Sequence, residues 1–360
     1  MSKPTQELYD LGQSLWLDNI TRRMLGDGTL EGYIRELSVT GLTSNPTIFD
    51  KAISATEDYD EQIAEDAPHS DSHEELFFKL AIADLSDATK LFAEVNERTA
   101  GVDGWCSLEV SPTIADDTEA TTQQAAKLHA DAACENLYIK IPGTPAGLGS
   151  IEESIYAGIP INVALLFDDE QYLAAADAYL KGIERRIAEG KDPLVHSVAS
   201  IFMSRWDVAV KDDVSPELKD RLGIAGGGRA YRAYRELLDS PRMQRLMNEG
   251  ARPQRLLWAS TGTKDPEASD TLYIEAFASP FTVNTMPEPT LKAFADHGEI
   301  GDLMAADGGN SEQVLKEFEE AGIDVKALAQ RLQDEGKVAF VKSWDDLLDS
   351  IESKSKVVAG

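Results

Sequence analysis

The pattern of apolar and polar positions divides this 360-residue chain into short strand-like runs separated by longer helical segments. Several of the short runs are continuously apolar instead of alternating with polar residues. Continuous runs of this kind are typical of parallel strands that are buried on both faces of a sheet. The predicted strands are residues 15–20, 39–43, 104–110, 136–141, 159–167, 194–202, 255–261 and 271–278.

The segments between these runs carry apolar residues at helical spacing. Leu76 and Leu80 begin an apolar face in residues 72–98, and Tyr172 begins another in residues 168–189. Because strand and helix alternate eight times, the sequence predicts an α/β fold, a single (β/α)8 barrel. An open doubly wound sheet is the alternative, but no GxGxxG motif follows the first predicted strand.

Two parts of the chain exceed a minimal barrel, and we assign residues 1–360 to one barrel domain that contains both. Residues 207–254 form a predicted helical insertion between strands six and seven, and residues 311–356 form a predicted C-terminal helical extension. The glycine-rich residues 143–149 lack the Lys-Ser/Thr ending of a P-loop, so we interpret them as a strand-to-helix loop. The glycine triplet at 226–228 predicts a turn before a helix.

Composition narrows the possible partners. The chain has 64 acidic and 34 basic residues, a formal net charge of −30. This excess argues against non-specific nucleic-acid binding and against adhesion to anionic membranes, because both need a cationic face. Residues 1–7 lack the apolar run of a signal peptide, and no apolar stretch approaches the ~20 residues of a membrane span. Cys106 and Cys134 match no metal-binding spacing, so we expect a reduced, cytoplasmic protein.

Three ionisable residues lie within apolar predicted strands, where an unpaired charge is costly. They are Asp18, Glu109 and Lys140, in the first, third and fourth predicted strands. Function in a barrel lies at the C-terminal ends of the strands. Burial of a lysine favours the neutral amine that Schiff-base chemistry needs, and two carboxylates can supply an acid and a base. Alternatively, the lysine side chain extends to solvent, or the three residues form structural ion pairs.

Amides and cations supply candidate binding groups. Asn45 and Asn162 offer donors and acceptors that suit sugar hydroxyls, although Asn45-Pro46 is also a common turn sequence. Arg205 follows the sixth predicted strand, and Ser260 and Lys264 follow the core of the seventh. Cations and hydroxyls in the late loops of a barrel suit a phosphate group, whereas a single exposed Arg or Lys is usually solvated surface.

The histidines do not predict a metal site. His69 and His73 stand four residues apart, but they lie in a polar acidic stretch, so we expect both on the surface. His196 is alone in its predicted strand, and His129 lies on a helical pattern. A zinc site needs several ligands that converge, so we expect no metal.

Four ordered motifs give a specific resemblance to a known family. Residues 40–49 (TGLTSNPTIF), 138–144 (YIKIPGT), 161–167 (INVALLF) and 258–264 (WASTGTK) resemble transaldolase, particularly its longer bacterial branch. The likeness covers nearly the whole chain. It implies a metal-free Schiff-base enzyme without a cofactor, which acts on sugar phosphates in the non-oxidative pentose phosphate pathway. A dihydroxyacetone unit would pass from sedoheptulose 7-phosphate or fructose 6-phosphate to an aldose phosphate.

The resemblance also implies roles for individual residues. Lys140 would form the Schiff base, Asp18 would take the proton of the C4 hydroxyl, and Glu109 would move protons and water. The implied substrate-binding residues are Asn45, Asn162, Ser200, Phe202 and Arg205, to which we add Ser260 and Lys264 as candidates from their positions in the late loops of the barrel.

This sequence departs from the family pattern at two positions. Ala164 stands where many transaldolases carry a threonine that helps to place the catalytic water. Lys264 is offset from the usual position of a second phosphate-binding arginine. A simple Schiff-base aldolase and a catalytically silent sugar-phosphate binder are the alternatives, and the complete set of Lys140, Glu109 and Asp18 argues against the silent barrel. The sequence leaves both a monomer and a homodimer open.

Overall fold

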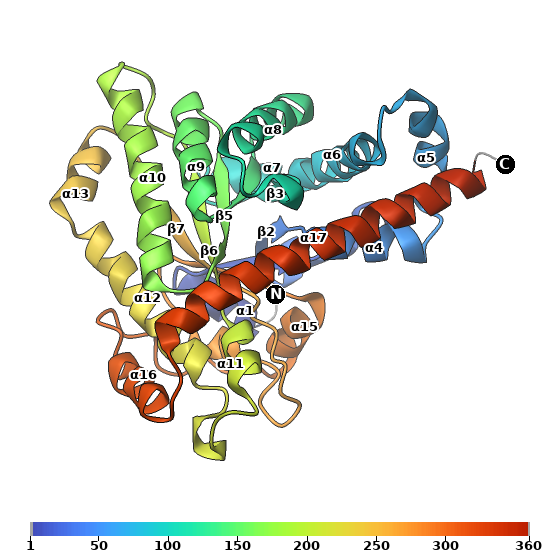
Figure 1. Ribbon diagram of the computed structural model, residues 1–360. Helices are drawn as coiled ribbons and strands as arrows, with labels where there is room; N and C mark the ends of the chain where they lie inside the picture. The colour runs from blue at the N-terminus through green and yellow to red at the C-terminus, as the bar shows by residue number, and fades with distance from the viewer. Residues whose placement is uncertain (1–2, 359–360) are drawn as a thin grey trace.

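A computed structural model describes residues 3–358. Its core is a sheet of eight parallel strands in the order β2-β1-β8-β7-β6-β5-β4-β3, surrounded by helices (Figure 1). A parallel bridge between Gly41 and Trp105 joins β2 to the residue before β3, so the two edges of the sheet meet. The predicted (β/α)8 barrel is confirmed. The strands are β1 (Ser14–Asp18), β2 (Val39–Thr43), β3 (Cys106–Glu109), β4 (Leu137–Pro142), β5 (Ile161–Leu166), β6 (Ser197–Phe202), β7 (Arg255–Ala259) and β8 (Val283–Met286).

The junction between β2 and β3 depends on a residue without a side chain. The Leu42 N–H donates to the Trp105 carbonyl oxygen at 2.9 Å. A β-carbon on Gly41 would lie 2.6 Å from Nε1 of Trp16 and 2.7 Å from the Trp105 carbonyl oxygen, which is closer than van der Waals contact. Glycine at this position therefore lets the barrel close around the Trp16 indole.

The prediction of the eighth strand is wrong. Residues 271–278 contain the helix α14 (Leu272–Ala276), and the strand is the later segment Val283–Met286. The apolar residues of the misassigned segment recur at helical spacing, and the stacked rings of Tyr273 and Phe277 have centroids 6.0 Å apart. The true strand escaped detection because it is only four residues long and two of its buried residues are polar.

Helices form the outer layer, and the predicted insertion and extension are both helical. Before β3 the chain forms α1 (Lys3–Asp10), α2 (Arg22–Gly26), α3 (Thr29–Glu36), α4 (Pro46–Ala55), α5 (Asp60–Asp66), α6 (His73–Leu91) and α7 (Ala93–Arg98). Between β3 and β7 it forms α8 (Thr118–Ala132), α9 (Pro145–Ala157), α10 (Asp169–Ala188), α11 (Ser204–Val210), α12 (Leu222–Leu238) and α13 (Pro241–Asn248). After α14 follow α15 (Glu288–His297), α16 (Ser311–Glu320) and α17 (Val325–Val358). Short 3-10 turns are η1 (Ala67–His69), η2 (Pro112–Ile114) and η3 (Pro216–Leu218).

Two glycine-rich segments are helical where the sequence predicted a loop or a turn. Helix α9 begins at Pro145, so the end of the segment 143–149 already belongs to it. The triplet at 226–228 lies inside α12. Close packing explains the triplet, because a β-carbon on Gly227 would lie 2.3 Å from the ring of Phe277.

Helix α17 crosses the end of the barrel at which the strands finish. In Figure 1 it runs from beside α16, past the strands, to α4 and α5. The Gln333 amide donates to the carbonyl oxygens of Gly143, just after β4, and Leu165, in β5, at 3.1 and 2.9 Å. Farther along the helix, the Trp344 ring packs against Phe77, with centroids 5.1 Å apart. The C-terminal extension is therefore fixed over the mouth of the barrel.

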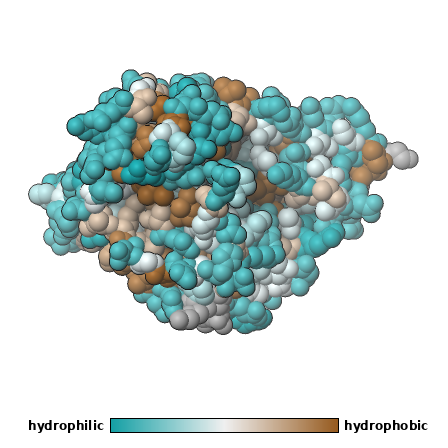
Figure 2. Space-filling view, turned by 90° about the horizontal axis from the view of Figure 1, so that it is seen from below, coloured by the Kyte–Doolittle hydropathy of each residue, from teal (hydrophilic) through white to brown (hydrophobic). Residues whose placement is uncertain are grey.

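The surface in one view is mostly hydrophilic. Figure 2 shows a face on which hydrophilic residues predominate and hydrophobic residues form smaller patches. Within residues 3–358, no helix combines the length and apolar character needed to cross a membrane.

Candidate active site

Lys140 and Glu109 lie side by side on neighbouring strands inside the barrel. They are paired in the register of β3 and β4, and Lys140 Nζ donates to Glu109 Oε2 at 3.1 Å. Both side chains are only 7% exposed. The same Nζ lies 3.3 Å from the Ser44 carbonyl oxygen, after β2. Lys140 therefore does not extend to solvent, and its amine has a carboxylate proton acceptor within hydrogen-bond distance.

Asp18 ends β1 and brings a second carboxylate to the same region. Its Oδ1 accepts a hydrogen bond from Thr43 Oγ1 at 2.9 Å, and Thr43 Oγ1 lies 2.8 Å from Thr285 Oγ1 on β8. The hydroxyl pair fixes the orientation of Asp18 from the two strands that flank β1. Both carboxylates, Asp18 on β1 and Glu109 on β3, lie close enough to Lys140 for its positive charge to favour their ionised forms.

Burial changes the acidity of both carboxyl groups. It raises the pKa of Glu109 above the ordinary value, although the charge and hydrogen bond of Lys140 oppose that rise. It also raises the pKa of Asp18, opposed by the charge of Lys140 and the hydrogen bond from Thr43. A raised pKa makes each carboxylate a stronger base than it is in water, which suits proton transfer near neutral pH.

A cavity of about 340 Å³ opens above Lys140 at the C-terminal ends of the strands. The structure brings most of the predicted residues to its wall: Asp18, Asn45, Lys140, Ser200, Phe202, Arg205, Ser260 and Lys264. Glu109 lies beneath this wall, against the Lys140 amine. Pockets at this end of a barrel are the usual location of an active site.

Asn162 is buried beside the cavity without lining it. Its Nδ2 donates to Ser107 Oγ at 3.1 Å, and its Oδ1 accepts from Ser200 Oγ at 2.7 Å. In this structure its amide therefore orients Ser200, which does reach the cavity. Asn45 caps α4, where its side chain accepts from the Ile48 N–H at 3.1 Å, and the residue also lines the cavity.

Arg205 is a cation without a carboxylate partner among residues 3–358. Its guanidinium carbon lies 5.2 Å from the centre of the Phe202 ring and 5.9 Å from that of Phe340. Burial lowers its pKa, and the charge of Glu109 opposes this. The two neighbouring aromatic rings stabilise the guanidinium and leave its N–H donors available for an anion.

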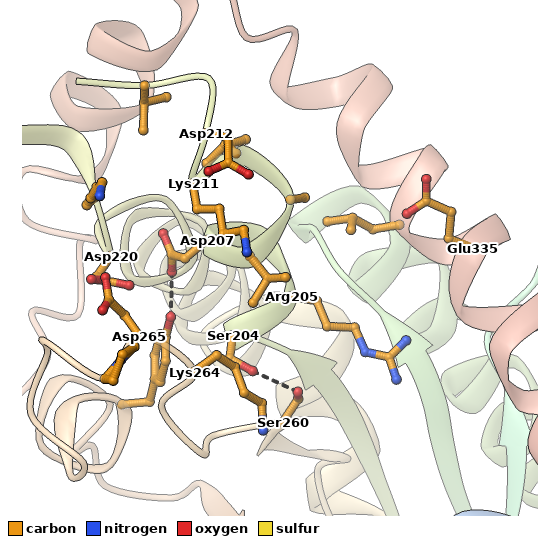
Figure 3. Close-up of a pocket in the computed structure, with 18 residues that line it drawn as sticks. Ser204, Arg205, Asp207, Lys211, Asp212, Asp220, Ser260, Lys264, Asp265 and Glu335 are labelled. Carbon is orange, nitrogen blue, oxygen red and sulfur yellow. Dashed lines mark hydrogen bonds between the residues drawn. The ribbon is translucent and has the colours of Figure 1, made fainter. Parts of the chain in front are cut away.

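A second, outer cavity of about 710 Å³ adjoins the first (Figure 3). Arg205, Ser260 and Lys264 line both. Figure 3 shows Ser260 bonded to Ser204, with the two hydroxyl oxygens 2.9 Å apart. The Lys264 side chain is exposed, whereas Arg205 is half-buried. The two cavities together offer space for an extended substrate with an anionic end.

The sequence did not point to several residues that line the inner cavity. The most significant is Phe340 of α17, whose ring centre lies 5.7 Å from Lys140 Nζ. No local pattern could have indicated it, because a single phenylalanine in an amphipathic helix looks like a packing residue. Lys51 could have been found as the cation one turn after Asn45-Pro46. The other lining residues that we did not predict are Thr43, Thr47, Ile48, Ala259, Thr285, Ala339 and Ser343.

Ala164, where the sequence departs from the family pattern, lies on β5, the strand next to β4, which carries Lys140. Ala164 is fully buried in β5, where its carbonyl oxygen accepts from the Gly143 N–H at 2.7 Å. It does not line the inner cavity. A buried hydroxyl nearby is that of Ser107 on β3, whose Oγ accepts from Nδ2 of Asn162 on β5 at 3.1 Å.

The histidines lie away from this site. His69 and His73 are exposed, as expected. His129 lies on α8, and His196 immediately precedes β6 at the opposite end of the barrel. In the part of the chain that the structure describes, no three His, Cys, Asp or Glu residues are grouped so that they could hold a metal ion.

Fold and site together define a class: a (β/α)8 barrel with a buried lysine and two carboxylates at one cavity. The chain belongs to the Transaldolase/Fructose-6-phosphate aldolase family, whose model matches residues 15–351. It is 42% identical to the transaldolases of Kocuria rhizophila and Thermobifida fusca, over 98% of this chain and of each relative. It is 38% identical to the transaldolase of Trichodesmium erythraeum over 97% of both chains. The resemblance seen in the motifs is confirmed.

Proposed function

We propose that this protein is a transaldolase that moves a dihydroxyacetone unit from a ketose phosphate to an aldose phosphate through a Schiff base on Lys140. The observation that carries the proposal is the contact between the Lys140 amine and the Glu109 carboxylate at the base of a cavity that also holds Asp18. Sedoheptulose 7-phosphate and fructose 6-phosphate are the donors, and glyceraldehyde 3-phosphate and erythrose 4-phosphate are the acceptors.

Imine formation uses Lys140 and Glu109. Glu109 accepts the proton that Lys140 must lose, and the neutral amine attacks the C2 carbonyl of the donor. The resulting carbinolamine loses its hydroxyl as water, with a proton returned from Glu109. The buried position of Glu109, which raises its pKa, allows it both to accept and to return this proton.

Carbon–carbon cleavage uses Asp18. Its carboxylate takes the proton of the C4 hydroxyl, the C3–C4 bond breaks, and the electron pair moves into the protonated imine to form an enamine. The departing aldehyde carries the phosphate. Attack of the enamine C3 on an acceptor aldehyde reverses these steps, and Asp18 returns the proton to the new hydroxyl. The protonated imine is itself the electron sink, so this chemistry needs no metal.

Arg205 holds the phosphate in this proposal, with Ser260 and Lys264 beside it. These residues lie between the inner and outer cavities, so the three-carbon unit occupies the inner cavity and the phosphate end extends outward. Ser200, oriented by Asn162, and Asn45 bind the hydroxyls of the three-carbon unit. Phe202 packs beside it.

Trapping the imine tests the proposal. Incubation with fructose 6-phosphate and borohydride should add one reduced adduct, mapped by mass spectrometry to Lys140. Lys140→Arg should form no adduct and have no activity, because guanidinium stays protonated. Lys127→Arg, at an exposed lysine, is the matched control and should behave as wild type. An adduct on another lysine, or none on the wild type, would refute the mechanism.

Product analysis separates a transferase from a simple aldolase. With fructose 6-phosphate alone, a transferase should release little free dihydroxyacetone, and addition of erythrose 4-phosphate should produce sedoheptulose 7-phosphate. Rapid release of dihydroxyacetone that is unaffected by the acceptor would identify an aldolase instead.

A further inference from the structure

A second cavity lies at the opposite end of the barrel, where the strands begin. Its volume is about 380 Å³, similar to that of the inner active-site cavity. It is formed by the starts of β4, β6 and β7, the loops before β3 and β8, and helices α12 and α13 with the loop after α13. The mechanism above uses no residue of this cavity.

The walls of this cavity are mainly aromatic and apolar. Tyr138, Tyr234 and His196 form part of the wall. Phe281, Met247 and Val102 also line it, and these three side chains are 63%, 43% and 41% exposed. A cavity of this size with an aromatic lining and a few polar groups is typical of a small-molecule site.

Phe281 is held at the cavity in an unusual backbone conformation. Its φ is 62°, a left-handed value that is rare for a bulky residue. Two hydrogen bonds fix this conformation: the Phe281 N–H donates to the Gly12 carbonyl oxygen at 2.9 Å, and the Phe281 carbonyl oxygen accepts from Tyr234 Oη at 2.8 Å. The structure thus maintains a strained turn that presents an aromatic ring to solvent instead of burying it.

Three arginines, Arg235, Arg252 and Arg255, are among the polar residues of the cavity. Arg235 and Arg252 form no ion pair among the described residues, although the chain carries a large excess of acidic residues. Asp239 is the acidic residue of the lining, and its charge adds to the effect of the Tyr231 hydrogen bond, which raises the pKa of Arg235. Arg255 is paired with Asp103 at 3.1 Å. Arg235 Nε is buried without a hydrogen-bond partner.

Two neutral groups add unused hydrogen-bonding capacity. Within residues 3–358, neither the Tyr138 hydroxyl nor the His196 ring nitrogens have a hydrogen-bond partner. Burial, together with the charges of Arg252 and Arg255, lowers the pKa of His196 to about 4, so its ring is neutral at pH 7. A neutral imidazole and a phenol can each donate or accept one bond to a bound molecule.

We propose that this cavity binds a small organic anion that carries a planar aromatic ring. The ring lies among Phe281, Tyr234 and His196, and the acidic group meets the guanidinium groups of Arg252 and Arg235. Within residues 3–358 each of these groups donates one hydrogen bond, from Arg252 Nη1 to the Ala100 carbonyl oxygen at 2.7 Å and from Arg235 Nη1 to Tyr231 Oη at 3.0 Å, and its other N–H donors remain for the anion. Aromatic side chains favour stacking with such a ring, and two arginines that form no ion pair within residues 3–358 favour an anion. The site is independent of Schiff-base chemistry, so it can exist whether or not the proposed function is correct.

A matched pair of dyes tests this proposal with the full-length protein. The probe is 8-anilino-1-naphthalenesulfonate, an aromatic anion, and its neutral counterpart is N-phenyl-1-naphthylamine, which lacks the sulfonate. Fluorescence titrations in saturating fructose 6-phosphate keep the active site occupied. We expect one saturable site for the anion and at least tenfold weaker binding of the neutral dye.

Variants then locate the site. Arg252→Gln should weaken binding of the anion roughly tenfold and leave the neutral dye unchanged, and Arg235→Gln provides a second test if the first variant folds poorly. Phe281→Asn, which tolerates the left-handed backbone, should weaken both dyes. Arg98→Gln is the control, because Arg98 also forms no ion pair with any residue that the structure describes but does not line the cavity.

Four outcomes would overturn the proposal: absence of a saturable site, equal affinity for the two dyes, displacement of the anion by fructose 6-phosphate, or equal weakening by Arg98→Gln. Sedimentation at the titration concentration completes the test. A dimer that dissociates on Phe281→Asn would show that a second copy of the chain covers this face, and that the aromatic anion does not.

Discussion

Lys140 Nζ lies 3.1 Å from Glu109 Oε2 inside the barrel, and neither side chain has more than 7% of its surface exposed. The two residues occupy paired positions on adjacent parallel strands, so the contact follows directly from the register of the sheet. It places a proton acceptor beside the amine before any substrate is bound.

Replacement of Glu109 should slow imine formation. Glu109→Gln keeps the shape of the side chain but cannot accept the Lys140 proton, so we expect the rate of adduct formation to fall about 100- to 10,000-fold. The measurement is borohydride-trapped adduct against time. Glu74→Gln is the control, because burial also raises the pKa of Glu74 but it contacts Gln124, away from the site. A normal rate of trapping in Glu109→Gln would contradict the role of Glu109.

Asp18→Asn should stop the reaction one step later. The imine can still form, but the C4 hydroxyl has no base, so we expect a six-carbon adduct from fructose 6-phosphate to accumulate on Lys140. Turnover should fall by about 100- to 10,000-fold. Intact-protein mass after borohydride reduction measures the carbon skeleton. A three-carbon adduct that forms at the wild-type rate would mean that Asp18 is not the base for cleavage.

The pH dependence should reflect buried carboxylates. Both Asp18 and Glu109 have a pKa raised above ordinary values of 3.8 and 4.5, and both act as bases when ionised. As the pH falls through these raised values the groups become protonated, so the acidic limb of kcat should lie above pH 4.5. Thr43→Val removes a hydrogen bond that lowers the pKa of Asp18, and it should move the limb to higher pH. A shift to lower pH, or none, would contradict this assignment.

Arg205→Ala should act selectively on phosphorylated substrates. Loss of a charge-assisted contact at a half-buried site typically costs about 2–5 kcal/mol, which corresponds to roughly 30-fold or more in kcat/KM. Fructose, which has no phosphate, is the internal control and should lose far less. Lys264→Ala should have a smaller effect, because that side chain is exposed. Equal losses for fructose and fructose 6-phosphate would make Arg205 a structural residue.

Phe340 should keep water away from the three-carbon intermediate. Its ring lies 5.7 Å from Lys140 Nζ, between the site and solvent on α17. We expect Phe340→Ala to raise the release of free dihydroxyacetone relative to transfer several-fold. Because Phe→Ala in a core lowers the free energy of unfolding by about 3–5 kcal/mol, the alanine variant changes stability as well as water entry. Phe340→Leu keeps most of the apolar volume, so comparison of the two variants separates these effects.

Val338→Ala is the matched control on the same helix, because Val338 is 66% exposed. It should leave the ratio of release to transfer unchanged. An unchanged ratio in Phe340→Ala would show that α17 covers the site without affecting the fate of the intermediate.

The sequence by itself determined the barrel and much of the inner site. Continuously apolar strands must be buried on both faces, which a barrel does between its interior and a helical layer, and this pattern indicated seven of the strands in their correct places. Lys140, Glu109 and Asp18 were recognisable because a charge within an apolar strand needs a specific partner. The eighth strand was misassigned because four residues with two buried polar positions carry no apolar pattern.

Only the tertiary structure decided what lies over the cavity and how its groups contact each other. Phe340 is 200 residues from Lys140 in the chain, and only the path of α17 brings its ring to the amine. The distance from Lys140 to Glu109 depends on strand register, which no single strand sequence specifies. Arg205 could be recognised as a cation from its position, but whether a carboxylate of residues 3–358 pairs with it depends on every neighbouring element. The local pattern of apolar and polar residues thus predicts the helices and strands. It cannot predict the distances between the reacting groups, because those distances are set by packing between residues far apart in the sequence.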